Sequence, residues 1–203
     1  MKENEIEVLK KYIPTESINY VVNIFNKIPI KLIIKRKRHT KSGDYKYSSI
    51  DKKHCITINY DLNKYNFLIT LIHEIAHAIT FEETKYKNVK PHGIEWQNNF
   101  KKIIFPLINA NVFPENLKEK LIIHFLKPKA STYSDKVLLK ELNTYSLKND
   151  LYIEDIPINA IFMLENGNVY QKLEKNRTRF KCKSLNNDKI YLISSLAPIK
   201  LMN

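Results

Sequence analysis

The sequence predicts an α+β fold in two parts, a mostly helical domain followed by a small β-rich module. Two observations indicate this division. Apolar residues recur with helical spacing through most of the first 126 residues, interrupted by a group of short strand-like segments, whereas alternating segments around the turns NGN and NND dominate the C-terminal part. We therefore expect a domain at 1–126, a linker at 127–135 that includes KPKAST, and a β-rich module at 136–203.

The domain is expected to open with two short helices and three strands. Pro14 separates helices predicted at 4–12 and 15–27, and Thr15 is a plausible N-cap for the second. The turn residues SGD follow the first strand-like segment, which favours three strands in an antiparallel meander. The three predicted strands are IKLIIKRKR (30–38), YKYSSI (45–50) and HCITINY (54–60).

Three longer helices should follow these strands. The first opens at Asp61 and keeps an apolar pattern to about Phe81. The second starts near His92, after a polar loop, and is expected to end at Pro106 because proline interrupts helical hydrogen bonding. The third covers 114–126.

The composition indicates a globular protein with an anionic partner. The formal net charge is +13, which favours binding to nucleic acid, although a lysine-rich, A/T-rich genome would give the same excess. No apolar run reaches the roughly 18 residues of a membrane helix, so we expect no membrane partner. The charged N-terminus and the two cysteines fit a cytoplasmic protein.

The segment HEIAH (73–77) suggests a metal site. His73 and His77, four residues apart, lie on one face of the predicted helix, where both imidazoles can reach one ion. The segment matches the zincin pattern H-E-x-x-H, in which Glu74 would be the general base. A pair of satisfied core histidines is the alternative interpretation. A catalytic zinc ion needs a third protein ligand, and His92 in KPHGIEW is the better candidate, with Glu95 as the other.

These residues together predict metal-assisted amide hydrolysis. One Zn²⁺ held by His73, His77 and His92 would lower the pKa of its water toward about 7. Glu74 would take the proton of that water and pass it to the leaving amine. Residues that could stabilise the oxyanion are candidates by proximity only, namely Tyr60, Tyr65 and Tyr86.

The first part of the chain resembles the SprT-like family, which includes the Spartan DNA–protein crosslink proteases. The resemblance rests on TLIHEIAHA (70–78), on HGIEW (92–96) and on the order of the segments before them, and it covers about residues 5–125. It implies a zincin-like metalloprotease core with His73, His77 and His92 as zinc ligands and Glu74 as catalytic acid/base. It also implies protein substrates held on or crosslinked to DNA.

The C-terminal part departs from the common pattern of this family, in which a zinc ribbon follows the protease core. Residues 127–203 contain one cysteine and no histidine, so a ribbon there would be degenerate and free of metal. KNRTRFKCK could replace it in DNA binding, because a single strand would place five cations on one face, with Tyr170 or Tyr191 as a stacking surface. The five are Lys175, Arg177, Arg179, Lys181 and Lys183.

Three functions remain open from the sequence. The first is a zinc metalloprotease acting on DNA-bound proteins, and the second is a nucleic-acid-binding protein with a structural or degenerate metal site. The third is a zinc peptidase or amidase that does not depend on DNA. The sequence does not indicate an oligomeric state.

Overall fold

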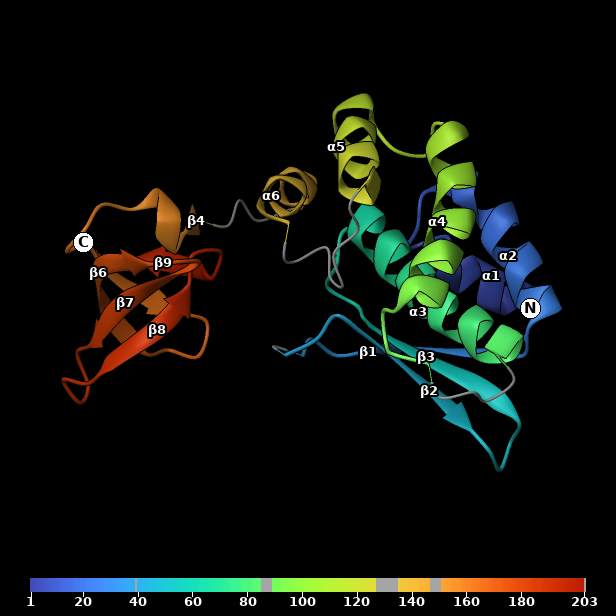
Figure 1. The fold of residues 1–203 in the computed structure, drawn as a ribbon, viewed down its shortest axis with the longest axis horizontal. Helices are drawn as coiled ribbons and strands as arrows, with labels where there is room; N and C mark the ends of the chain where they lie inside the picture. The colour runs from blue at the N-terminus through green and yellow to red at the C-terminus, as the bar shows by residue number, and fades with distance from the viewer. Residues whose placement is uncertain (39, 85–88, 127–134, 147–150, 203) are drawn as a thin grey trace. The chain divides into compact units, whose positions relative to one another are not determined.

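The computed structural model describes residues 1–38, 40–84, 89–126, 135–146 and 151–202. The chain divides into two compact units, Met1–Leu147 and Lys148–Asn203 (Figure 1). The predicted α+β class is confirmed, with helices and one sheet in the first unit and a second sheet in the other. Within the described ranges, no helix combines the length and apolar character needed to cross a membrane.

The first unit contains helices on one side of a three-stranded sheet (Figure 1). Its core is one cluster of buried side chains drawn from the helices and from β3. The described elements are α1 (Glu3–Leu9), a 3₁₀ turn (Thr15–Ser17), α2 (Ile18–Lys27), β1 (Ile30–Lys35), β2 (Gly43–Ser48), β3 (Lys53–Asn59), α3 (Lys64–Thr84), α4 (Ile94–Asn109), α5 (Glu115–Leu126) and α6 (Lys136–Thr144).

The predicted antiparallel meander is wrong, because the strand order is β1-β3-β2. β1 pairs with β3 in parallel, and β2 pairs with β3 in antiparallel orientation. β3 takes the central position and is the most buried of the three, with Ile56 and Ile58 fully covered. Arg38, in the connection that leaves β1, donates hydrogen bonds to Thr57 Oγ1 at 2.9 Å and Asn59 Oδ1 at 2.8 Å. These bonds tie the crossing connection to the end of β3.

Helix α3 runs through the middle of the unit and is buried along most of its length. It begins three residues later than predicted, because Asn63 rather than Asp61 caps it, accepting a hydrogen bond from the Asn66 N–H at 3.0 Å. Helix α4 passes Pro106 and ends at Asn109, because Leu107 and Ile108 are buried in the core.

Helix α6 was not predicted, and it belongs to the first unit. Asp135 caps its N-terminus by accepting a bond from the Leu138 N–H, and Leu138 and Leu142 join the core. Asn63 donates a 2.8 Å hydrogen bond to the Leu142 carbonyl, which ties α6 to the start of α3. The compact unit therefore extends past the boundary expected at residue 126. Of the expected linker, residues 127–134 lie outside the described residues.

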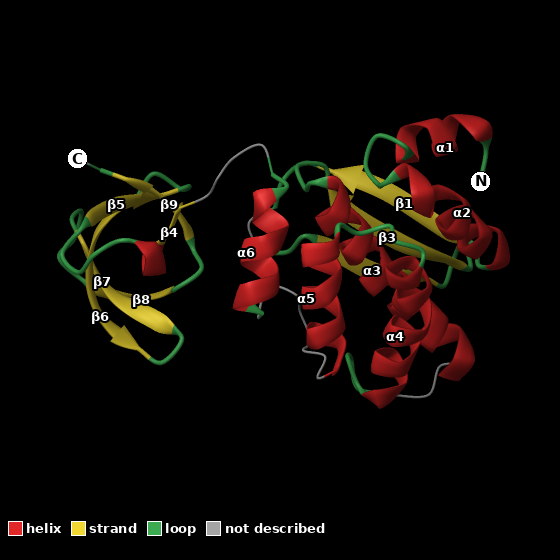
Figure 2. Ribbon diagram, turned by 90° about the horizontal axis from the view of Figure 1, so that it is seen from above, coloured by secondary structure: helices red, strands yellow, loops and turns green. Residues whose placement is uncertain are grey.

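The second unit is β-rich, as predicted for the C-terminal part, and its strands form one six-stranded sheet (Figure 2). The strand order is β4-β9-β5-β6-β7-β8, around a small core that includes Phe162, Phe180 and Cys182. The sequence suggested a ribbon-like module here, whereas the structure shows a sheet with its own core. Its elements are β4 (Leu151–Tyr152), a 3₁₀ turn (Ile153–Asp155), β5 (Ile161–Leu164), β6 (Val169–Asn176), β7 (Arg179–Ser184), β8 (Ile190–Ser194) and β9 (Pro198–Leu201).

Candidate metal centre

Helix α3 supplies two of the three predicted ligands from one face. His73 and His77 are one helical turn apart, and the residues between them include the fully buried Ile75 and Ala76. The apolar face anchors the helix in the core. The positions of the two imidazoles on the adjoining face are therefore fixed relative to the core.

The third predicted ligand, His92, comes from the segment just before α4. Its backbone adopts a positive φ of 58°, an uncommon conformation for a residue other than glycine. Gln97 donates a 3.0 Å hydrogen bond to the His92 carbonyl, and the N–H of Gly93 donates to the Lys90 carbonyl. A Cβ at position 93 would lie 2.9 Å from that carbonyl oxygen. Glycine at position 93 therefore permits the tight turn that presents His92.

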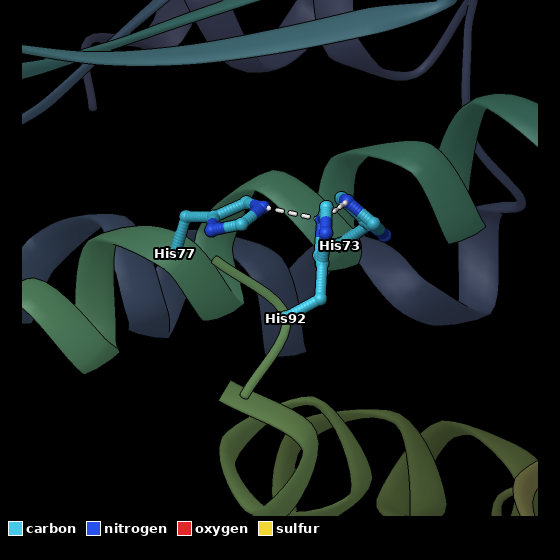
Figure 3. Close-up of side chains that lie close together, drawn as sticks. All are labelled: His73, His77 and His92. Atoms are coloured by element: carbon cyan, nitrogen blue, oxygen red, sulfur yellow. Dashed lines mark hydrogen bonds between the residues drawn. The ribbon is translucent and has the colours of Figure 1, made fainter. Parts of the chain in front are cut away.

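The structure brings the three histidines together (Figure 3). The Nε2 atom of His92 lies 3.1 Å from the Nε2 atoms of both His73 and His77. The imidazole rings point toward a common point from α3 and from the segment just before α4 (Figure 3). Among the described residues, this is the one group of three or more potential metal ligands.

The donor set fits a tetrahedral metal ion. Zn–N bonds of about 2.0–2.1 Å in tetrahedral geometry place neighbouring nitrogen atoms about 3.3 Å apart, close to the separation observed here. Three neutral imidazoles with converging Nε2 atoms cannot all be satisfied by hydrogen bonds to one another, because each ring carries one proton. A cation at the common point would satisfy all three lone pairs.

Electrostatics keep these imidazoles neutral, which is the form that binds metal. Burial, with smaller contributions from His77 and His92, lowers the pKa of His73 to about 3. Burial, with repulsion from His92, lowers the pKa of His77 to about 4, and burial also lowers the pKa of His92. The lone pairs are therefore available at neutral pH.

Glu74 lies beside His73 on the wall of the same cleft, and the N-terminus of β2 makes room for it. A Cβ at Gly43 would collide with the Glu74 carboxylate and would lie 2.7 Å from Thr70 Cγ2. Burial and, to a smaller extent, the charge of Asp44 raise the pKa of the Glu74 carboxyl to about 8, against the opposing effect of Arg38 and Lys41. A carboxyl group with a pKa near neutrality is suited to accept and return a proton.

The cleft has a volume of about 480 Å³ and is open to solvent on one side. His73, His77 and His92 line it together with Glu74, so the candidate metal ligands and the candidate base face one space. Its other lining residues come from β2, from the end of α3 and from the segment before α4, namely Gly43, Asp44, Tyr45, Thr80, Phe81, Val89, Lys90, Pro91 and Trp96.

Two residues of this site, Trp96 and Tyr45, were not identified from the sequence. Trp96, included in the sequence analysis only within the segment HGIEW, contacts all three histidines, with ring centroids 4.6 Å from His73 and His92 and 5.4 Å from His77. Tyr45, assigned only to a strand, lies nearly parallel to the His77 ring at 5.8 Å. The helical spacing of His92 and Trp96 could have suggested the first contact, but no local pattern indicates the second.

Of the tyrosines suggested as oxyanion donors, Tyr60 and Tyr65 do not line the cleft. Tyr60 is 54% exposed, and Tyr65 packs against Phe113 and Tyr145. Tyr86 lies outside the described residues. Glu95, the alternative third ligand, is exposed at the start of α4 and is not part of the histidine cluster.

The predicted single strand with five cations on one face is wrong. Arg177 has a positive φ of 55° in the turn between β6 and β7, so the segment is a hairpin. Lys175 lies opposite the buried Phe180 and therefore shares its face, whereas Arg179, Lys181 and Lys183 lie on the other face of β7.

Some charged and aromatic side chains of this hairpin already interact with other residues of the protein. Lys181 pairs with Glu174 at 2.7 Å and Lys183 with Asp188 at 2.9 Å. Tyr170 is buried, while Tyr191 is 39% exposed and remains accessible for stacking.

Comparison with known protein families gives a match within the first unit only. Residues 17–116 match the model of the SprT-like family. This segment begins before α2, ends in α5 and includes all three histidines and Glu74. No curated protein and no solved structure gives a significant match to the chain.

Proposed function

Because residues 17–116 belong to the SprT-like family, a family of metalloprotease-like domains, we propose that this chain is a zinc metalloprotease acting on proteins bound or crosslinked to DNA. The observation that carries the proposal is the convergence of three histidine Nε2 atoms beside a buried carboxyl group in an open cleft. His73, His77 and His92 are the proposed ligands of one zinc ion.

Each residue has a distinct role in this proposal. Zinc bound by the three histidines would supply a Lewis acid and a water of lowered pKa. Glu74 receives the proton of the attacking water on its carboxylate and returns it to the nitrogen of the leaving amine. Trp96 holds the three imidazoles in place, and Gly43 leaves space for the Glu74 carboxylate.

A catalytic role is favoured over a structural one by the number of ligands. Structural zinc sites are closed by four protein ligands, whereas catalytic sites keep a position open. The described part of the chain offers three ligands, and the cleft lies in front of them. A structural site would also have no use for a buried glutamate at its edge, because burying an unpaired carboxyl group is unfavourable.

The proposed substrate rests on two lines of support. Family membership supports a protein substrate, and the net charge of +13 favours attraction to DNA. The cleft is open rather than enclosed, so a polypeptide segment could enter it from the side.

Cleavage of a basic DNA-binding protein in the presence of zinc tests the proposal. We expect cleavage that increases when single- or double-stranded DNA is added and that is lost in Glu74→Gln. Cleavage that is equal with and without DNA would contradict the DNA-bound substrate and leave a DNA-independent peptidase. A zinc-loaded protein that cleaves no protein substrate under any condition would contradict the protease.

A further inference from the structure

Tyr45 connects the metal-binding face of α3 to a hydrogen-bonded chain that runs through the buried His54 to Glu82. Its ring lies 5.8 Å from the His77 ring between centroids, with an interplanar angle of 11°. Its hydroxyl group is 2.9 Å from Nδ1 of His54 on β3. The Nε2 atom of His54 is in turn 2.8 Å from Oε1 of Glu82 near the end of α3.

The direction of the bond to Glu82 follows from the groups involved. The Glu82 carboxylate only accepts, so His54 donates to it through its Nε2–H. Nδ1 of the same ring bonds to the Tyr45 hydroxyl group, so both ring nitrogens of His54 have partners. His54 is fully buried, so this arrangement is fixed by the fold rather than by solvent.

The geometry points to Tyr45 as a positioning residue for His77, held in turn by His54 and Glu82. A histidine that binds metal needs a fixed ring plane, so that its lone pair points at the ion. A hydrogen bond from the second ring nitrogen commonly fixes that plane, but no described residue provides one at His77 Nδ1. The parallel Tyr45 ring is suited to this task, and Trp96 contacts the same imidazole at 5.4 Å.

Tyr47 provides a matched control on the same strand. It lies two residues from Tyr45, on the same face of β2, and it also packs against His54 and Phe81, at 5.2 and 4.4 Å. Tyr45 lines the cleft, whereas Tyr47 does not. A general loss of packing between β2 and α3 should therefore follow from either substitution, but a change in the metal site should follow only from Tyr45.

Co²⁺ titration of the full chain tests this inference, because the visible absorption of Co²⁺ reports both affinity and ligand geometry without any catalytic assay. We expect Tyr45→Leu to weaken Co²⁺ binding by about tenfold or more, the range found when outer partners of metal ligands are removed, and to shift the absorption bands. Tyr47→Leu should change the affinity by less than about twofold. Tyr45→Phe keeps the ring and loses the bond to His54, so it should weaken binding by about threefold.

The outcomes separate this inference from the proposed function on which it rests. If wild type binds no Co²⁺, the proposed metal site itself fails. If wild type binds and Tyr45→Leu affects affinity and spectrum no more than Tyr47→Leu, the positioning role is contradicted. Thermal unfolding of each variant shows whether it is folded. If Tyr45→Leu does not fold, Tyr45→Phe becomes the deciding variant. A Tyr45→Phe protein with the Co²⁺ affinity and absorption spectrum of wild type would then overturn the inference.

Discussion

The indole ring of Trp96 lies 4.6 Å from the imidazole of His73, measured between ring centroids, with an interplanar angle of 61°. The same buried indole contacts the other two histidines, and its Nε1–H donates a 3.4 Å hydrogen bond to the His73 carbonyl. One side chain of α4 therefore supports all three candidate ligands, two of which come from α3.

This contact makes Trp96 an internal reporter of metal binding, since it is the single tryptophan of the chain. Co²⁺ held by the three histidines would lie close enough to quench the indole by energy transfer. We expect saturable quenching with Co²⁺, reversed by excess Zn²⁺ and absent in His92→Ala. Tryptophan fluorescence that does not respond to Co²⁺ in a protein shown by absorption to bind it would place the metal elsewhere.

The substitution Gly43→Ala should disturb Glu74, the proposed base, rather than the three histidines. The added Cβ would collide with the Glu74 carboxylate and would crowd Thr70 Cγ2. We expect a loss of about 1–3 kcal/mol in the free energy of unfolding, the usual cost of overpacking, with zinc still bound. Urea denaturation and metal analysis measure the two quantities.

A double-mutant cycle provides the control for this substitution. In a Glu74→Ala background the carboxylate is gone, so Gly43→Ala should cost less than it does in wild type. An equal cost in both backgrounds would show that the two side chains do not compete for the same space.

The raised pKa of Glu74 predicts a pH dependence of the metal-free protein. In the folded state the carboxyl group keeps its proton up to a pKa of about 8, whereas in the unfolded chain it loses it near 4.5. The folded state therefore binds more protons between these values, and stability falls as pH rises through this window, by at most about 1.4 kcal/mol per pH unit. Glu74→Gln carries no such proton and should gain stability relative to wild type from pH 5 to pH 8.

Urea denaturation of both metal-free proteins at pH 5 and pH 8 measures this difference. His73 and His77 are present in both proteins, so their own protonation largely cancels in the comparison. A stability difference that is the same at both pH values would contradict a raised pKa for Glu74.

The local sequence pattern was sufficient to predict the helix that carries His73 and His77. Its apolar residues and its two histidines both follow the spacing of one α-helix. The start of the next helix near His92 was also predicted, although the tight turn that Gly93 permits there becomes visible only in the structure. The strand order was not predictable in this way. Parallel pairing of β1 with β3 requires a crossing connection, and Arg38 in that connection binds the far end of β3, a contact that no local pattern indicates.

Contacts between elements distant in the sequence explain the other differences. Tyr45 reaches His77 across 32 positions of the chain, so no motif records their proximity. Helix α6 joins the first unit through a hydrogen bond between Leu142 and Asn63, 79 positions earlier in the chain. The period of two in KNRTRFKCK suggested one strand, but the positive φ of Arg177 turns the segment into a hairpin.

If the second unit contributes to DNA binding, the hairpin arginines should dominate its contribution. Among the described residues, Arg177 and Arg179 form no ion pair, whereas Lys181 and Lys183 are paired with carboxylates. We expect the double variant Arg177→Ala/Arg179→Ala to weaken DNA binding more, and to reduce its salt dependence more, than Lys181→Ala/Lys183→Ala. Equal effects of the two pairs, measured by fluorescence anisotropy at several salt concentrations, would contradict this ranking.

The most direct test of the central claim compares peptide-bond cleavage and zinc content in wild type and in Glu74→Gln. The three histidines are unchanged in the variant, so we predict one zinc ion per chain in both proteins. We predict cleavage of a basic DNA-binding protein by wild type in the presence of DNA, and a loss of at least about a hundredfold in rate in Glu74→Gln, as expected for removal of a general base. Equal cleavage by both proteins, or a wild type that binds no zinc, would contradict the account.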